Sequence, residues 1–238
     1  MNILRWALRA AAIVLILFVL GCARFPDTAP TTGRQLVLTL TVRGRISPID
    51  NITGKQRYYF FAIDNDNDPT TYPEAWTDPT RGGNGWVTSD RAAESIGLTS
   101  YVQYDPTTPD GLVMRVLPGS NFLNTGSPQL PLRVELLDGG TTLSVTLDFS
   151  QIATDAIPAD KITQLNINFI TTDSLSRSGD PNRQTDGLGP TGRDAVSIST
   201  VTDGLRPPIY DEADFPPVTD PDIDIVRATI EVHTVSSR

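Results

Sequence analysis

Residues 131–147 have the sequence PLRVELLDGGTTLSVTL, and this segment decides the fold class. Apolar residues take every second position on both sides of a central Asp-Gly-Gly: Leu132, Val134, Leu136, Leu143, Val145 and Leu147. A period of two is typical of a β-strand with one buried face, and Asp-Gly-Gly is typical of a tight turn. The segment therefore predicts a β-hairpin in which these six side chains face inward, while Ser144 and Thr146 point to water.

Strand patterns recur along the rest of the chain. They predict further strands at residues 35–42, 57–63, 101–104, 112–117, 161–170, 195–201 and 226–233. The run 57–63 is apolar on both faces, so we expect it in the middle of a sheet that is covered on both sides. About nine short strands joined by turn-rich loops predict an all-β fold, namely an antiparallel β-sandwich.

Further details of this pattern concern single strands and the connections between them. The strand 161–170 alternates Leu165, Ile167 and Phe169 with Asn166 and Asn168. The segment Ser89–Ser95 has the capping residues of a short helical turn. The connections 171–194 and 202–224 are too long for simple turns, and loops of this length are either mobile or functional. In the last strand, the residues expected to face inward are Val226, Ala228, Ile230 and Val232.

The N-terminus has the layout of a secretory signal. Arg5 and Arg9, with no acidic residue near them, precede the apolar run 10–20, which is the order found in such signals. The run is shorter than the about 20 residues that a membrane-spanning helix needs. We expect residues 1–21 to be a cleaved signal peptide, 22–34 a flexible tether and 35–238 a single β-sandwich domain.

The residues Val19-Leu20-Gly21-Cys22 resemble the lipobox of bacterial lipoproteins. That resemblance implies that Cys22 carries palmitate-type acyl chains and anchors the mature chain to the lipid bilayer. Cys22 is the only cysteine, so no intramolecular disulfide is expected although an exported chain could form one. The alternative is a lone cysteine at the end of an ordinary signal peptide or membrane anchor.

The charge of the chain excludes one class of partner. The formal charge is −9, and loss of residues 1–21 with their two arginines makes it −11. Such a domain has no electrostatic attraction for phosphate backbones or anionic membrane surfaces. Nucleic acid is therefore excluded as a partner, and membrane association has to come from the anchor.

The segment Asp64-Asn65-Asp66-Asn67-Asp68 directly follows the predicted strand 57–63. The carboxylates of Asp64, Asp66 and Asp68 are hard oxygen ligands of the kind that Ca²⁺ prefers. A helix-loop-helix site is excluded because the flanking residues do not fit it, which leaves an irregular loop site. The alternative is a polar turn, since Asp and Asn hydrogen-bond their own backbone. A second acidic group either supplies further ligands or is a solvated loop: Asp211, Glu212, Asp214, Asp220, Asp222 and Asp224.

Trp76 and Trp86 lie in the loop after this acidic segment, among glycine and proline residues. Aromatic side chains on such a loop can stack on a sugar or bind a protein partner. The alternative is a small satellite core that holds the loop in place. Exposed tryptophans would favour ligand binding, and buried ones would favour the packing role.

Catalysis has little support in the sequence, and we expect no enzyme. His233 is the only histidine, and it falls on the polar face of the last predicted strand. A histidine-based triad, a thiol enzyme and a zinc site with several His or Cys ligands are therefore poorly supported. A glycosidase with paired carboxylates remains an alternative, because the distance between two carboxylates is set by the tertiary structure and cannot be taken from the sequence.

The order of features is similar to that of DOMON domains and family-nine carbohydrate-binding modules. The similarity rests on an aromatic strand that runs into an acidic loop (58–68), a hairpin that ends at 147–150, and the strand 167–173. It implies a β-sandwich that binds a ligand, often with structural calcium. It assigns no ligand residue in this chain.

Two functions follow as expectations. The first is a non-catalytic binding module of the cell envelope that recognises a glycan or a protein. The second is a structural or assembly component of the same envelope. Ala23 stands where an aspartate retains lipoproteins in the inner membrane of some bacteria, which favours the outer membrane or the cell surface.

Overall fold

A computed structural model describes residues 33–50, 52–76, 83–88, 97–117, 125–175, 182–214 and 217–235 of the chain. All of them belong to one compact unit, Thr31–Arg238. Cys22 and the segment Ser89–Ser95 lie outside the described residues, so their predictions stay open. No helix in the described part of the chain is long and apolar enough to cross a membrane.

The first sheet has the strand order β12-β14-β1-β8-β7, and β13 also pairs with β14. Its strands are β1 (Arg34–Val42), β7 (Arg133–Leu137), β8 (Thr142–Asp148), β12 (Gly204–Leu205), β13 (Ile209–Tyr210) and β14 (Ile225–Thr234). A short 3₁₀ turn, η2 (Asp138–Gly140), joins β7 to β8. The predicted hairpin 131–147 is therefore present in the structure.

The second sheet has the order β10-β9-β2-β5-β6, and β11 also pairs with β9. Its strands are β2 (Tyr58–Asp64), β5 (Ser100–Tyr104), β6 (Leu112–Arg115), β9 (Gln164–Thr172), β10 (Thr185–Gly187) and β11 (Val196–Ser199). β3 (Glu74–Ala75) and β4 (Val87–Thr88) form a separate pair, and two short helical segments are α2 (Phe149–Ile152) and η3 (Ala159–Lys161). All named strand pairs are antiparallel, which confirms the predicted all-β class.

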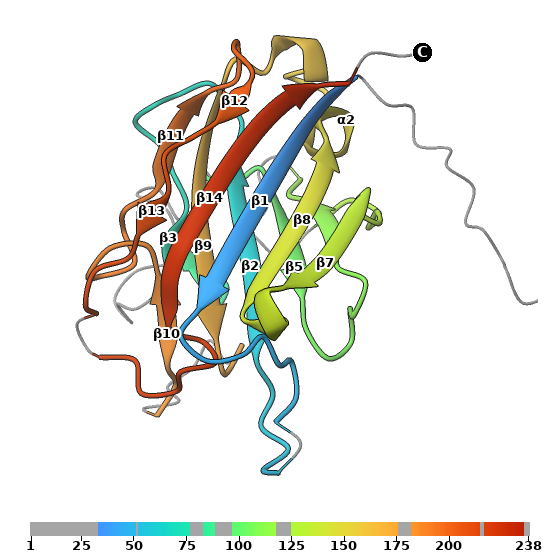
Figure 1. Ribbon diagram of the computed structural model, residues 1–238. Helices are drawn as coiled ribbons and strands as arrows, with labels where there is room; N and C mark the ends of the chain where they lie inside the picture. The colour runs from blue at the N-terminus through green and yellow to red at the C-terminus, as the bar shows by residue number, and fades with distance from the viewer. Residues whose placement is uncertain are drawn as a thin grey trace, which may run out of the picture. The chain divides into compact units, whose positions relative to one another are not determined.

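The main core lies between the two sheets, as Figure 1 shows with β1, β8 and β14 in front of β2, β5 and β9. β1 contributes Leu36, Leu38 and Leu40, and β2 contributes Phe61 and Ile63 from the facing sheet. All five side chains are fully buried. Alternate inward residues of two antiparallel sheets form the core of a sandwich in this way, so the predicted architecture is confirmed.

A second, smaller core lies on the outer face of the second sheet. Phe60 and Ala62 of β2 point away from the main core and pack with Tyr101 of β5 and with Trp86 and Val87 next to and within β4. Because both faces of β2 are covered, its sequence is apolar at nearly every position. The prediction that residues 57–63 lie mid-sheet is confirmed.

The hairpin departs from the prediction on one of its two strands. Leu143, Val145 and Leu147 of β8 are buried as predicted, but Leu132 is 38% and Leu136 is 48% exposed. The physical reason is that β7 is the edge strand of its sheet, so no further strand covers it. Ser144 was also predicted to point to water, and this prediction is wrong: Ser144 is buried between the neighbouring strands β1 and β7.

The inward prediction for Val226 is also wrong. The pairing of β1 with β14 shifts between Thr41, opposite Arg227, and Val42, opposite Ile225. This β-bulge gives the inward place to Ile225 and leaves Val226 half-buried. The two long connections contain ordered strands, β10 in the first and β12 and β13 in the second.

Candidate functional site

The predicted calcium loop forms a series of turns at the end of β2. The amide of Asp66 donates to Asp64 Oδ1 (3.3 Å), and the amide of Asp68 donates to Asp66 Oδ1 (2.7 Å). The amide of Thr70 in turn donates to Asp68 Oδ1 (2.8 Å). Each carboxylate thus accepts a hydrogen bond from the backbone two residues further on, which is the turn chemistry of aspartate.

Asp64 is the buried member of this loop, with 1% of its surface exposed. Burial, and next the negative charge of Asp66, raise the pKa of Asp64 to about 7. The Thr71 hydroxyl lies 3.0 Å from Asp64 Oδ2 and 3.1 Å from Asp66 Oδ2. The geometry favours the turn interpretation, and calcium binding by Asp64, Asp66 and Asp68 stays a prediction.

The asparagines of β9 hold the loop against the outer face of the second sheet. Asn166 Nδ2 donates to the carbonyls of Asp68 (2.8 Å) and Thr71 (2.6 Å). Asn168 Nδ2 donates to the carbonyls of Pro73 (3.0 Å) and Gly192 (2.9 Å). Both asparagines are buried, so this polar face of β9 binds backbone rather than solvent.

The two predicted ligand-binding tryptophans are each only 5% exposed. The Trp86 ring stacks on Phe60 with 3.9 Å between centroids and an interplanar angle of 8°. The Arg183 guanidinium lies 4.3 Å from the centre of the Trp76 ring, and its Nη2 donates to the Trp76 carbonyl (2.8 Å). Burial and these contacts favour the packing role over stacking on a ligand.

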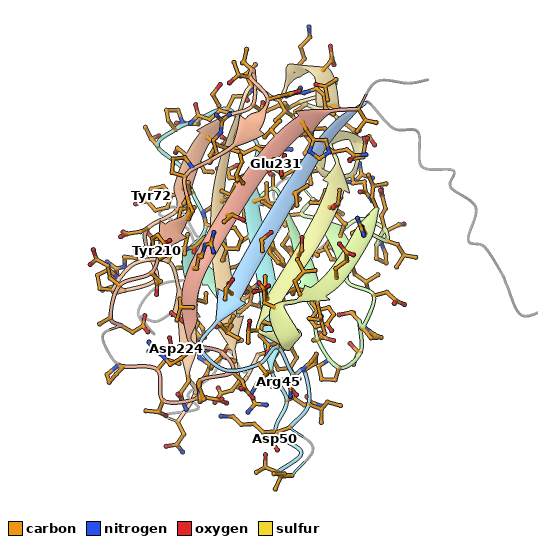
Figure 2. All side chains as sticks on the ribbon, in the orientation of Figure 1. Arg45, Asp50, Tyr72, Tyr210, Asp224 and Glu231 are labelled. Carbon is orange, nitrogen blue, oxygen red and sulfur yellow. The ribbon has the colours of Figure 1, made fainter. Side chains whose placement is uncertain are left out.

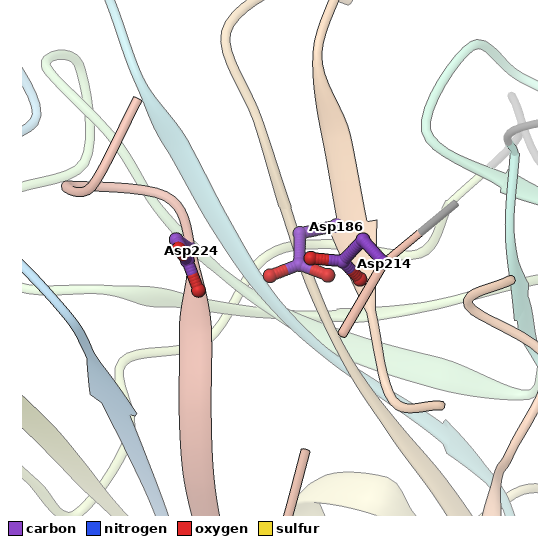
Figure 3. Close-up of side chains that lie close together, drawn as sticks. All are labelled: Asp186, Asp214 and Asp224. Carbon is purple, nitrogen blue, oxygen red and sulfur yellow. The ribbon is translucent and has the colours of Figure 1, made fainter. Parts of the chain in front are cut away.

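A different set of residues forms the strongest candidate site. One carboxylate oxygen each from Asp186, Asp214 and Asp224 lie within 4.8 Å of one another, and no other such acidic, histidine or cysteine group occurs among the described residues. Figure 3 shows the carboxylates of Asp186 and Asp214 side by side, with Asp224 at the start of β14. In Figure 2, Asp224 lies at the same end of the sandwich as Arg45.

Three chain segments bring these carboxylates together. Asp186 lies in β10, which pairs with the end of β9, and Asp224 directly precedes β14. Asp214 follows β13. Asp214 and Asp224 belong to the second acidic group that the sequence identified, but Asp186 was missed. No local pattern marks it, because it meets the others only through the sheet pairing.

The hydrogen bonds of the site fix two of its carboxylates. Asp186 Oδ1 accepts from the Gly187 amide (2.7 Å) and Oδ2 from the Ile225 amide (2.5 Å). Asp224 accepts from Arg43 Nε (2.6 Å) and Nη2 (3.3 Å). The charge of Asp214 acts on Asp186, because carboxylate oxygens of these two residues lie within 4.8 Å of each other.

Asp211 adds a fourth carboxylate near this group. Its Oδ1 accepts from the Gly189 amide (2.6 Å), whereas its Oδ2 is buried and has no hydrogen-bond partner among the described residues. Burial raises the pKa of Asp211 to about 7. Burial, and next the charge of Asp214, raise the pKa of Asp186, and burial raises that of Asp214. The positive charge around these carboxyl groups does not compensate for their burial, so their protonated forms are favoured.

The neighbouring acids have a different environment. Arg57, which is 4% exposed, donates to Asp220 Oδ2 (3.0 Å) and lies 3.2 Å from Asp222 Oδ2. Lys55 also contacts Asp220 (3.2 Å). Burial alone would raise the pKa of Asp220, but these hydrogen bonds lower it. Within this acidic group, Asp220 and Asp222 are thus paired with Arg57, and Asp224 is paired with Arg43. Burial instead raises the pKa values of Asp211 and Asp214.

A pocket of about 230 Å³ opens beside the candidate site. Asp211, Asp214 and Asp224 line it together with Arg43. Such a volume holds a hydrated metal ion or a small polar group. We call these four residues and Asp186 the acidic pocket.

His233 does not take part in any of these groups. Its Nε2 lies 3.0 Å from Gln35 Oε1, and its Nδ1 lies 3.9 Å from Glu231. Both contacts are with side chains of the first sheet's outer face. This favours the expected role as a surface histidine with satisfied partners.

Comparison with known proteins adds no relative. No protein-family model, no curated protein and no solved structure matches this chain.

Proposed function

We propose that this protein is a lipid-anchored, extracytoplasmic binding module without catalytic activity, and that its acidic pocket binds a divalent cation such as Ca²⁺. The observation that carries the proposal is the convergence of Asp186, Asp214 and Asp224 beside a pocket of about 230 Å³. In this proposal the cation site is the acidic pocket rather than the loop of Asp64, Asp66 and Asp68.

The chemistry of the pocket fits a calcium ion. Ca²⁺ takes about six to eight oxygen ligands with variable geometry. The three converging carboxylates and the unpartnered Oδ2 of Asp211 supply part of this set. Water and a ligand group from a glycan or a protein would complete it. A bound cation would also compensate the burial and the mutual repulsion that raise the pKa values of Asp186, Asp211 and Asp214.

Thermal unfolding with added Ca²⁺ tests the cation site. The fragment Thr31–Arg238 contains both hydrophobic cores and every described strand, so it is suited to the measurement. We expect millimolar Ca²⁺ to raise Tm, and more so at pH 8 than at pH 6, because protons compete with the metal. Asp214→Asn should remove the Ca²⁺-dependent shift.

Asp64→Asn is the matched control, since it changes one carboxylate of the other candidate loop. Loss of the Tm shift in Asp64→Asn, with its retention in Asp214→Asn, would move the site to that loop. No shift in the unaltered protein at millimolar Ca²⁺ would contradict a cation site in either place.

The lipid anchor at Cys22 has its own test. Metabolic labelling with a palmitate analogue in a bacterial host should label the full-length chain and not Cys22→Ala. Label that persists in Cys22→Ala would exclude the anchor. The same cells, separated into membrane fractions, would show whether the chain lies in the outer membrane.

A structural or assembly role is the second candidate. The burial of Trp76 and Trp86 favours it, because neither ring is free to stack on a sugar. Glycan-array binding that requires Ca²⁺ would favour the binding module. A soluble fragment that binds no glycan with or without Ca²⁺ would favour the assembly role.

A further inference from the structure

The outer edge of β7 has no strand paired with it among the described residues. β7 is the last strand of the first sheet, and beyond its ladder with β8 no backbone group of Arg133–Leu137 has a backbone partner in the described ranges. The corresponding edge of the second sheet is closed, because Val113 of β6 exchanges two hydrogen bonds with Gln129 (2.8 and 3.0 Å). An open edge is a template for another strand.

The side chains of this edge are apolar except for one ion pair. Leu132, Leu136 and Leu137 are 38%, 48% and 40% exposed. Arg133 and Glu135 form an ion pair (2.6 Å) on the outer face of the strand. An edge strand with exposed leucines is a surface that a further strand can cover.

We propose that β7 pairs with β7 of a second copy of this chain, antiparallel, about a two-fold axis at Val134. This interaction surface goes beyond the proposed cation-binding function and does not depend on it. In this register Arg133 lies opposite the partner's Glu135, and Leu132 lies opposite the partner's Leu136. The two-fold axis repeats both pairs, so the contact is self-complementary.

The charges select this register over its neighbours. Residues directly opposite each other in an antiparallel pair point to the same face, so the axis has to pass through a residue to keep the two sandwiches aligned. An axis at Glu135 would place two glutamates in direct opposition, and one at Arg133 would do the same with two arginines. Only the axis at Val134 places each charge opposite the other sign.

The expected affinity is low. Each cross-strand pair contributes roughly 0.2–1 kcal/mol, and an edge of this length buries less than the about 1,200 Å² of a stable interface. We therefore expect a dissociation constant on the order of 100 µM. Sedimentation of the fragment Thr31–Arg238 over a wide concentration range measures it.

Charge reversal tests the register. Arg133→Glu and Glu135→Arg each place like charges in opposition and should weaken dimerisation about tenfold. The double variant R133E/E135R restores opposite charges and should dimerise like the unaltered protein. An equimolar mixture of the two single variants should form mixed dimers with about the affinity of the unaltered protein, although each variant alone dimerises about tenfold more weakly. Thermal unfolding of every variant checks that the monomer is folded.

Cross-linking supplies an independent readout. The fragment Thr31–Arg238 contains no cysteine, because Cys22 is the only one in the chain. A mixture of Arg133→Cys and Glu135→Cys should form a disulfide-linked dimer on mild oxidation, and neither variant alone should do so to the same extent. Equal cross-linking of the single variants, or a monomer at all concentrations, would overturn the proposal.

Discussion

At the scale of single residues, Asn168 shows how a buried polar side chain organises a whole region. Its amide donates to two carbonyls, of Pro73 and Gly192, and its Oδ1 accepts from the Leu188 amide (3.1 Å). The side chain is fully buried. This one residue of β9 thus fixes two segments. The first comes after the acidic loop, and the second follows β10, the strand that contains Asp186.

Replacement of Asn168 by alanine should destabilise the protein by about 2–5 kcal/mol, because it leaves buried carbonyl and amide groups without partners. Urea unfolding of the fragment Thr31–Arg238 measures the change. Gln164→Ala on the same strand is the matched control and should cost less than about 1 kcal/mol, since Gln164 is only half-buried. Equal costs for both variants would contradict the anchoring role.

The sequence predicted the strand that holds Asn168 but not its environment. Alternation of Leu165, Ile167 and Phe169 identified the inward face. The partners of Asn168 come from two distant segments, and no spacing within 161–170 reports them. For the same reason Asp186 escaped prediction, although the acidic residues around Asp214 were recognised.

At the scale of elements, the short pair β3–β4 is the least predictable part of the fold. Each strand has two residues, too few for a period of two to be visible. The apolar outer face of β2 nevertheless required a cover. Trp86, which precedes β4, supplies much of that cover through its contacts with Phe60 and Tyr101.

Trp86→Ala should destabilise the protein by about 3–5 kcal/mol, as for other large aromatic residues removed from a core. Trp86→Phe is the matched variant, since it keeps a ring against Phe60, and should cost less. Denaturant unfolding gives the free energies, and limited proteolysis shows whether the segment around β4 becomes accessible. A neutral Trp86→Ala would mean that the second core contributes little to stability.

At the scale of the whole molecule, the sandwich concentrates acidic groups that are more easily protonated in the folded than in the unfolded chain. Burial raises the pKa values of Asp64 and Asp211 to about 7, against about 3.9 for an unfolded aspartate. The folded state therefore binds more protons between these values. Stability from these groups is complete below pH ~4 and is lost as the pH rises through ~7.

We accordingly expect the free energy of unfolding, measured without divalent cations, to fall between pH 4 and pH 8. Asp64→Asn removes one of the responsible groups and should therefore make the free energy of unfolding fall less over this range. The reduction is at most about 1.4 kcal/mol for each unit by which the pKa of Asp64 differs between the folded and the unfolded chain. Chemical denaturation at several pH values gives the slope. A stability that rises from pH 5 to pH 8 would contradict the assignment.

The pairing of β1 with β14 has a consequence for the order in which the protein is made. β1 lies between β8 and β14, so the first sheet lacks an inner partner until residues 225–234 become available. Contacts between such distant parts of a chain slow folding. A nascent chain keeps the leucine-rich strand 34–42 unpaired on one side until its last strand emerges, and during this interval it is most exposed to aggregation.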